Sequence, residues 1–336
     1  MGLYYEQRAS GGLLITEAAA ISEDGSGWRN APHITTQQHA DAWKSHVVDR
    51  VHQKEGIIYL QLWHMGRQSH SSHHPNTNRT VSASAIAPEG IQVKTVGREN
   101  VEPEVPHALT VEEIKATVQD YVNAAKLAAD AGFDGIEIHS ANGYLIDQFF
   151  QSCSNTRSDE YGGSIENRTR FLVEIVEAII ESGAFPANRI GFRLSPNGAF
   201  GGMGSEDNYE QFMYVAKKMN EYGLAYLHLM DGLGFGAHGK CQYVKCADIR
   251  KVFDGPIISN VGLNRDVAEG MIRGGSCDAC AFGRLYISNP DLPERFANGW
   301  NVEPEAAYET WWYPTGEKGY TDWPVYSPPL EKVDSC

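Results

Sequence analysis

The sequence predicts an α/β protein, specifically a (β/α)8 TIM barrel that lacks its first strand. Short apolar runs alternate with longer amphipathic stretches along the whole chain, a pattern typical of a parallel sheet covered by helices. Seven apolar runs are present, whereas a barrel of this class has eight strands. The G-x-G-x-x-G pattern of dinucleotide-binding open sheets is absent, which favours the barrel over a doubly wound sheet.

The predicted strands are the apolar runs themselves. They are expected at 12–18, 56–63, 133–139, 189–195, 224–230, 255–260 and 277–283. The predicted helices are the stretches in which apolar residues recur at helical spacing, as Ile114, Val118 and Val122 do. They are expected at 36–54, 110–131, 164–183, 205–222, 241–252 and 264–273. A helical fragment, GLYYEQRA, precedes the first strand, so the chain is expected to begin inside the first helix of the barrel.

Size and charge narrow the kinds of partner. A chain of 336 residues suits one barrel, so we expect a single, incomplete TIM-barrel domain over 1–336. The net charge of −15 argues against nucleic acid and anionic membrane as partners. No apolar stretch is long enough to span a bilayer, and the N-terminus does not resemble a signal peptide. We therefore expect a cytoplasmic monomer or homodimer that acts on a small molecule.

The only close cysteine pair is CDAC, Cys277 to Cys280. Its spacing suits redox chemistry or zinc, but no second pair and no nearby histidine completes a site. We interpret these cysteines as small residues on a buried strand.

Alternation along three predicted strands locates a polar interior. Gln61, His139 and Arg193 each lie near the C-terminal end of a strand, on the face opposite to its aliphatic residues. Barrel enzymes build their sites at that end, so these three side chains are expected to converge. A single inward histidine is more often a core residue than a catalyst, and His228 is interpreted in that way.

Two further segments carry chemistry. The stretch HSANGY places His139, Asn142 and Tyr144 directly after a strand, where they could bind a ligand. Gly283 and Arg284 follow the last strand and begin a short helix. Loops at this place in barrels bind phosphate, and an arginine suits a phosphate carried by a cofactor.

Four segments together resemble the Old Yellow Enzyme family of FMN-dependent NADPH ene-reductases, including those similar to 12-oxophytodienoate reductase. They are IYLQLWHMGRQSH, HSANGYLIDQFFQSCSNTRSDEYGGSIENRTRF, AFGRLYISNPDLPERF and EKGYTDWP, in the order of the family. The resemblance extends from residue 1 to about residue 325. It implies an eight-stranded barrel with FMN as cofactor, NADPH as electron donor and an enone or enal as substrate.

The resemblance also implies roles for individual residues. His139 and Asn142 match the pair that hydrogen-bonds the substrate carbonyl, and Tyr144 matches the acid that protonates the α-carbon. The implied FMN contacts are Ala18, Gln61, Arg193, Gly262, Gly283 and Arg284. The implied substrate pocket contains Trp63, Trp312 and Tyr313, and Phe200, in the loop 195–203, is expected to touch substrate as well. The histidines near residue 70 match a surface loop of the family, and no metal site is expected.

One family element has no counterpart in the sequence. Members of the family carry a preceding strand with a Pro-x-Thr-Arg motif, whose threonine contacts the flavin. Its absence would open the strand edges and remove one wall of the flavin site. Two alternatives to an ene-reductase therefore stay open: a non-redox isomerase or cyclase on the same barrel, and an inactive paralogue. Retention of Arg193, Gly283 and Arg284 favours the reductase.

Overall fold

The computed structural model describes residues 1–232, 236–312 and 316–328. The chain packs as two compact units. The larger unit comprises Ile15–Lys44 and Ile58–Ala281, and the smaller unit comprises Met1–Leu14, Ser45–Ile57 and the segment from Phe282 onward. The expectation of a single domain over 1–336 stays a prediction.

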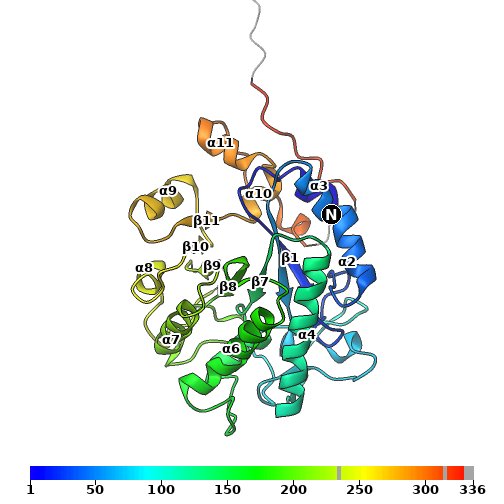
Figure 1. The fold of residues 1–336 in the computed structure, drawn as a ribbon, viewed down its shortest axis with the longest axis vertical. Helices are drawn as coiled ribbons and strands as arrows, with labels where there is room; N and C mark the ends of the chain where they lie inside the picture. The colour runs from blue at the N-terminus through cyan, green and yellow to red at the C-terminus, as the bar shows by residue number, and fades with distance from the viewer. Residues whose placement is uncertain (233–235, 313–315, 329–336) are drawn as a thin grey trace, which may run out of the picture. The chain divides into compact units, whose positions relative to one another are not determined.

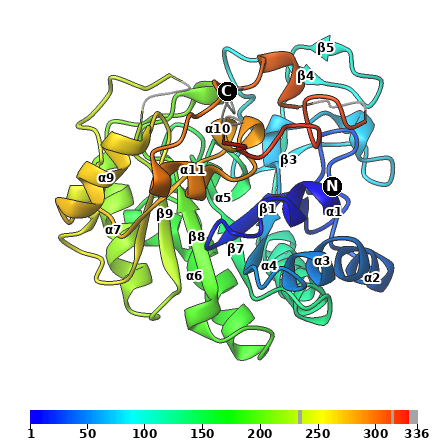
Figure 2. The same ribbon diagram turned by 90° about the horizontal axis from the view of Figure 1, so that it is seen from above.

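A seven-stranded sheet forms the centre of the larger unit. Its strands follow the order of the sequence from one edge to the other, and every register that the structure defines between neighbours is parallel. They are β1 (Leu14–Ala20), β2 (Ile58–Trp63), β7 (Gly135–His139), β8 (Ile190–Leu194), β9 (Tyr226–Met230), β10 (Ile257–Asn260) and β11 (Ala279–Ala281). Figure 2 shows β7, β8 and β9 side by side along their length. Each strand overlaps one of the predicted runs, so the strand predictions are confirmed.

The expectation that a barrel strand is missing is not confirmed. The sheet begins with β1 at Leu14–Ala20, which is the first predicted run shifted by two residues. The fold itself is the curled, parallel, helix-covered sheet of the predicted class.

Helices α4, α6, α7, α8 and α9 follow one another in an arc outside the sheet (Figure 1). The helices of the larger unit are α2 (Gln37–Trp43), α4 (Val111–Asp130), α5 (Leu145–Phe150), α6 (Ile165–Glu181), α7 (Asn208–Asn220), α8 (Cys246–Ile249) and α9 (Arg265–Arg273). α4 begins at Thr110, whose hydroxyl and the Glu113 carboxylate cap each other's backbone amides. Its buried face contains Ile114, Val118 and Val122, as the helical spacing predicted.

The predicted helix over 241–252 is wrong in its first half. Only α8, Cys246–Ile249, is helical. The Asn197 carboxamide accepts a hydrogen bond from the backbone N–H of Val244 and donates one to its carbonyl, at 2.9 and 2.8 Å. This pairing holds the backbone before α8 outside the helix, and the local sequence gives no sign of a partner so distant.

Residues 64–109 contain two small ladders that the sequence did not predict. β3 (Val81–Ser82) pairs with β6 (His107–Ala108) in parallel, and β4 (Val93–Lys94) pairs with β5 (Asn100–Val101) antiparallel.

Two glycines make room for aromatic rings at the N-terminal end of the sheet. A side chain at Gly135 would lie 2.3 Å from the Tyr59 ring, and one at Gly191 would lie 2.3 Å from the Tyr226 ring. The two rings lie 5.9 Å apart and fill this layer. The residues two positions later on the same strands face the same side of the sheet. They are the polar residues Gln61, Glu137, Arg193 and His228, and they lie next to the layer that the two rings fill.

The smaller unit contains α1 (Gly2–Glu6), α3 (Asp49–His52), α10 (Arg284–Ser288) and α11 (Leu292–Asn298). A π-helical turn at Lys44–Val48 leads into α3, so the predicted helix over 36–54 is present in three pieces. The buried Arg8 guanidinium donates to the carbonyl oxygens of Tyr4, Tyr286 and Ile287 at 2.8, 2.9 and 2.8 Å. These bonds join the N-terminal segment to α10.

Candidate functional site

Four neighbouring strands bring a polar layer together in the larger unit. Gln61 on β2 is the register partner of Glu137 on β7, and Arg193 on β8 is the partner of both His139 on β7 and His228 on β9. The predicted convergence of Gln61, His139 and Arg193 is thus confirmed. It follows from strand parity, because residues two apart on a strand share one face.

Glu137 lies at the centre of this layer and has no exposed surface. Its two carboxylate oxygens accept hydrogen bonds from Gln61 Nε2 at 2.6 Å and from His228 Nδ1 at 2.9 Å. Burial acts to raise the pKa of Glu137, but His228, Arg193 and the Gln61 amide outweigh it and hold the pKa at about 2. Glu137 is therefore a buried carboxylate, and it fixes the side-chain amide of Gln61.

The cluster that follows β7 is a tight turn. His139 ends the strand, Asn142 occupies the left-handed region at φ +60°, and Tyr144 is the N-cap of α5. Asn142 Nδ2 lies 3.5 Å from His139 Nε2, and the His139 and Tyr144 rings meet edge to face at 5.0 Å. Asparagine tolerates the left-handed region better than most residues. The turn therefore brings His139, Asn142 and Tyr144 together, as the sequence predicted.

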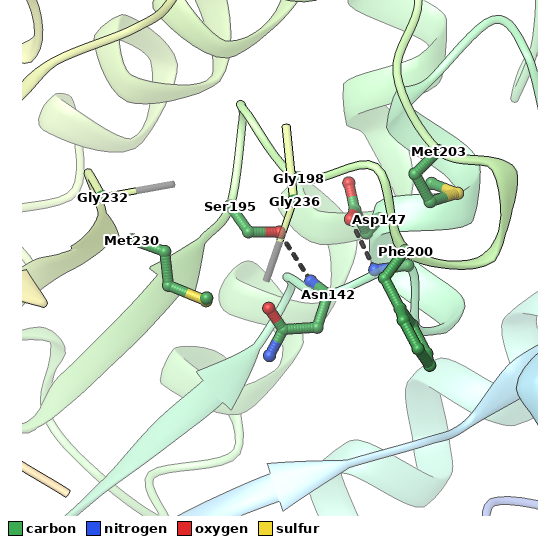
Figure 3. A pocket seen from close by; sticks show the side chains of 10 residues that line it. Asn142, Asp147, Ser195, Gly198, Phe200, Met203, Met230, Gly232 and Gly236 are labelled. Atoms are coloured by element: carbon green, nitrogen blue, oxygen red, sulfur yellow. Dashed lines mark hydrogen bonds between the residues drawn. The ribbon is translucent and has the colours of Figure 1, made fainter. Parts of the chain in front are cut away.

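Two side chains hold the backbone of this turn (Figure 3). The Asn142 N–H donates to Ser195 Oγ at 2.6 Å, and the Gly143 N–H donates to Asp147 Oδ2 at 2.8 Å. Asp147 is fully buried, and burial raises its pKa to about 7 despite hydrogen bonds from Gln151, Gly143 and Ser195.

The protonation states suit hydrogen-bond donation. Burial, and then the positive charge of Arg193, lower the pKa of His139 to about 3, so its imidazole is neutral near neutral pH. Burial raises the pKa of Tyr144 to about 12, although Arg193 and a hydrogen bond from Trp28 oppose the shift. Tyr144 thus keeps its phenolic proton. The site offers neutral donors beside the half-buried guanidinium of Arg193.

Nε of Arg193 and Nε1 of Trp63 are buried donors in this region that have no hydrogen-bond partner among the described residues. Trp63 ends β2, and its ring meets the Tyr144 ring at 5.2 Å. The other end of the Arg193 guanidinium donates from Nη2 to Asn260 Oδ1 at 3.1 Å. Since a buried donor without a partner is costly, these atoms fit a site that binds an electron-rich group such as a flavin ring.

The other predicted site residues of the larger unit, Ala18, Gly262 and Phe200, differ in their exposure to solvent. Ala18 is half-buried on β1, and Gly262 is exposed at φ +73° just after β10. Phe200 is 48% exposed, and it lines a cavity of about 30 Å³ together with Asn142, Met203 and Met230. Phe200 and Asn142 therefore face the same space.

In the smaller unit, Gly283 is the N-cap of α10 and Arg284 is its first residue. Arg284 Nη1 lies 3.4 Å from a carboxylate oxygen of Glu305, and its guanidinium lies 5.2 Å from the Trp311 ring centre. Trp312 is 56% exposed. Tyr313, the other predicted pocket residue of this segment, lies outside the described residues.

The two thiols of the cysteine pair lie close together. Cys277 Sγ and Cys280 Sγ lie 3.8 Å apart. Burial raises the pKa of both thiols, that of Cys280 to about 12, so they stay protonated.

Sequence reasoning missed four residues of the site: Glu137, Asp147, Ser195 and Asn260. Glu137 and Ser195 share the inward parity of His139 and Arg193, so the same pattern could have identified them. Asn260 gave no such signal, because the run that it ends has apolar Ile258 on its own face and polar Ser259 on the other. Asp147 gave none, because an acidic residue in the first turn of a helix is common at the surface.

Comparison with known proteins agrees with this geometry. The family model described as the NADH:flavin oxidoreductase / NADH oxidase family matches residues 1–303. The chain is 37% identical to 12-oxophytodienoate reductase 2 of Arabidopsis thaliana, over 96% of this chain and 85% of the relative. It is 38% identical to a probable flavin mononucleotide-dependent alkene reductase of Leishmania infantum, over 96% and 86% respectively.

A solved structure, that of the Old Yellow Enzyme homologue from Zymomonas mobilis, superimposes with a TM-score of 0.90 at 38% identity. The match covers 97% of this chain and 89% of the other. The chain therefore belongs to the NADH:flavin oxidoreductase / NADH oxidase family, and the predicted resemblance to the Old Yellow Enzyme ene-reductases is confirmed.

Proposed function

We propose that this chain is an FMN-dependent ene-reductase that reduces the C=C bond of α,β-unsaturated carbonyl compounds with NADPH as electron donor. The observation that carries the proposal is the turn after β7, which places His139, Asn142 and Tyr144 together beside half-buried Arg193. Family membership supports flavin and a nicotinamide donor, and the choice of NADPH over NADH is our prediction.

The chain's own residues would bind the cofactor as follows. Arg193 Nε and the Gln61 side chain would contact the flavin ring, with Ala18 supplying a backbone contact and Gly262 a further one. Gly283 and Arg284 would bind the phosphate. The partnerless donor on Arg193 supports this assignment. When bound, FMN supplies the hydride, which is chemistry that no side chain can provide.

The protein would polarise the substrate and complete the reduction. His139 and Asn142 would donate to the carbonyl oxygen and stabilise the negative charge that develops there. His139 suits this role because its pKa of about 3 keeps it a neutral donor. Tyr144 would then donate its phenolic proton to the α-carbon. Trp63 and Phe200 would line the pocket, with Trp312 and Tyr313 as further predicted members.

Other expectations rest on the same family assignment. We propose that the seven strands correspond to seven of the eight strands of the family barrel. No helix that the structure describes has both the length and the apolar character needed to cross a bilayer. The cytoplasmic location, and the monomer or homodimer, stay predictions.

The proposal is tested on the full chain, purified and desalted. We expect a yellow protein whose absorbance bleaches when NADPH is added without oxygen and returns when 2-cyclohexenone is added. Tyr144→Phe serves as a variant that should bleach but recolour slowly. A folded protein that takes up no FMN would overturn the reductase, and the non-redox isomerase or inactive paralogue would then lead. Bleaching by NADH alone would correct the donor.

A further inference from the structure

Glu137 is the one fully buried carboxylate of the polar layer to which the proposed reaction assigns no role. It lies two residues before His139 on β7, with no exposed surface. An isolated carboxylate at such a place would be very costly, and it is tolerated only when donors and positive charge surround it. Its surroundings therefore indicate what it does.

The first of these surroundings is the Gln61 side chain. Gln61 Nε2 donates to Glu137 Oε1 at 2.6 Å, while the backbone N–H of Gln61 donates to Thr16 Oγ1 at 3.1 Å. A carboxylate only accepts hydrogen bonds, so the amide nitrogen must face Glu137 and the amide oxygen must face away. Glu137 thereby selects one of the two orientations of the Gln61 amide.

The second is His228. Its Nδ1 lies 2.9 Å from Glu137 Oε2, so Nδ1 carries the proton. Burial lowers the pKa of His228, with Glu137 opposing the shift, and the imidazole is neutral near neutral pH. His228 therefore adds a hydrogen bond but no charge.

The third is Arg193, the cation of the layer. Glu137 and Arg193 act on each other electrostatically, and the positive charge of Arg193 helps to keep Glu137 ionised. With His139 and His228 neutral, the layer formed by Gln61, Glu137, His139, Arg193 and His228 holds one positive and one negative charge. The carboxylate of Glu137 therefore offsets part of the charge that Arg193 presents to a ligand.

We propose that Glu137 is a positioning residue that orients the Gln61 amide and offsets the charge of Arg193, and so sets how strongly the site favours negative charge on a bound flavin. The proposal rests on the proposed function, because it takes Gln61 and Arg193 to be the flavin contacts. A reduced flavin is an anion, so a carboxylate that offsets the charge of the arginine disfavours reduction and makes the reduced cofactor a stronger hydride donor.

The test compares three variants of the flavin-loaded full chain. Glu137→Gln removes the charge and Glu137→Asp keeps it, whereas Glu181→Gln removes an exposed charge at the end of α6 as a matched control. For Glu137→Gln we expect the ratio of reduced to oxidised flavin at a fixed potential to rise at least tenfold. For a two-electron couple this equals a positive shift of about 30 mV in midpoint potential. The midpoint potentials of Glu137→Asp and Glu181→Gln should stay close to that of the unaltered protein.

An unchanged midpoint potential in folded, flavin-loaded Glu137→Gln would overturn the proposal, because a purely structural role does not predict a shift. The dissociation constant of oxidised FMN gives a second readout. It should rise in Glu137→Asp, whose shorter side chain releases the Gln61 amide.

A stability cycle keeps the proposal testable if Glu137→Gln folds poorly or the chain binds no flavin. Arg193→Gln leaves the buried Glu137 carboxylate without its opposite charge, Glu137→Gln does the same to the half-buried Arg193, and the double variant leaves neither charge. We expect the double variant to melt at a higher temperature than additive effects would give. Additive effects would overturn the offset between Glu137 and Arg193. A chain that binds no flavin yet shows the coupling would refute the proposed function and leave this offset intact.

Discussion

The backbone N–H of Asn142 donates a 2.6 Å hydrogen bond to the hydroxyl of Ser195, and so ties the turn after β7 to the end of β8. Asn142 is in the left-handed region at φ +60°, a conformation that its own local preferences do not secure. The position of the Asn142 carboxamide beside His139 therefore depends on a residue 53 positions along the chain.

Ser195→Ala tests this dependence. Removal of the hydroxyl leaves the Asn142 N–H without its partner, which should lower the free energy of unfolding by about 1 kcal/mol. We expect KM for the enone to rise roughly fivefold, since the same free energy enters the positioning of Asn142. Steady-state kinetics and thermal melting measure the two effects.

The matched control is Ser182→Ala, which removes a hydroxyl that bonds locally to the Ile179 carbonyl at the end of α6. It should change melting slightly and leave KM alone. An equal KM for Ser195→Ala and the unaltered protein would show that the turn after β7 keeps Asn142 in place without the Ser195 hydroxyl.

Tyr144→Phe tests the proton donor. Burial raises the pKa of Tyr144 to about 12, so the phenol is protonated at working pH and can act as an acid. Loss of a general acid costs roughly a hundredfold or more, so enone turnover should fall by that factor. Bleaching by NADPH should proceed at its normal rate, because that step needs no proton from Tyr144. The two half-reactions are followed separately by stopped-flow absorbance.

Tyr161→Phe provides the control for removing a phenol. The Tyr161 hydroxyl donates to Glu174 at 2.8 Å, and neither residue belongs to the site. Turnover that survives in Tyr144→Phe at its normal rate would assign the proton to solvent or to another group.

Strand parity explains why so much of the site was predictable. The alternation in IYLQLW and GIEIH placed Gln61 and His139 on one face, and parallel pairing of neighbouring strands then had to bring them together. The seven strands were predictable from a different pattern: strands of a parallel sheet that is covered on both faces are short, largely apolar runs.

What the sequence did not reveal depends on contacts between distant residues. The two hydrogen bonds between the Asn197 carboxamide and the Val244 backbone shorten the helix that was predicted over 241–252. The ladders within residues 64–109 consist of two-residue strands, which are too short to show a sequence pattern. Asp147 looked like an ordinary first-turn acid of a helix, yet it is fully buried. Periodicity shows which face of an element is apolar but not which polar side chain from elsewhere reaches it.

Asp147 should make the stability of the protein depend on pH. Burial raises its pKa from 3.8 to about 7 in the folded protein, so the folded state keeps a proton that the unfolded chain has already released. The contribution of Asp147 to stability is therefore greatest below pH 3.8 and is lost as the pH rises to about 7. Asp147→Asn carries no ionisable group at this position.

The melting temperatures of Asp147→Asn and the unaltered protein should therefore diverge as the pH rises through this window, with the variant gaining relative to the unaltered protein. Thermal melts at several pH values measure the difference. A constant difference across the window would mean that the carboxyl of Asp147 ionises normally in the folded protein.

From the contact between Arg284 and Glu305 we predict that the FMN phosphate replaces the Glu305 carboxylate beside Arg284. Arg284 Nη1 lies 3.4 Å from Glu305 Oε2, and both side chains are partly exposed, so this ion pair is worth little. A phosphate offers two charges and a bidentate geometry, and should displace the carboxylate. Arg284→Ala should weaken FMN binding roughly tenfold to a hundredfold, the range for a lost hydrogen bond to a charged group.

Riboflavin, which has the same ring and no phosphate, separates the phosphate contact from the rest of the site. Its affinity should be the same in Arg284→Ala and in the unaltered protein. Glu305→Gln should bind FMN a few times more tightly, because the competing carboxylate is gone, and should leave riboflavin binding unchanged. If Arg284→Ala weakens both ligands equally, Arg284 supports the fold of its segment and the phosphate is bound elsewhere. Fluorescence titration of each ligand into the apoprotein decides between these outcomes.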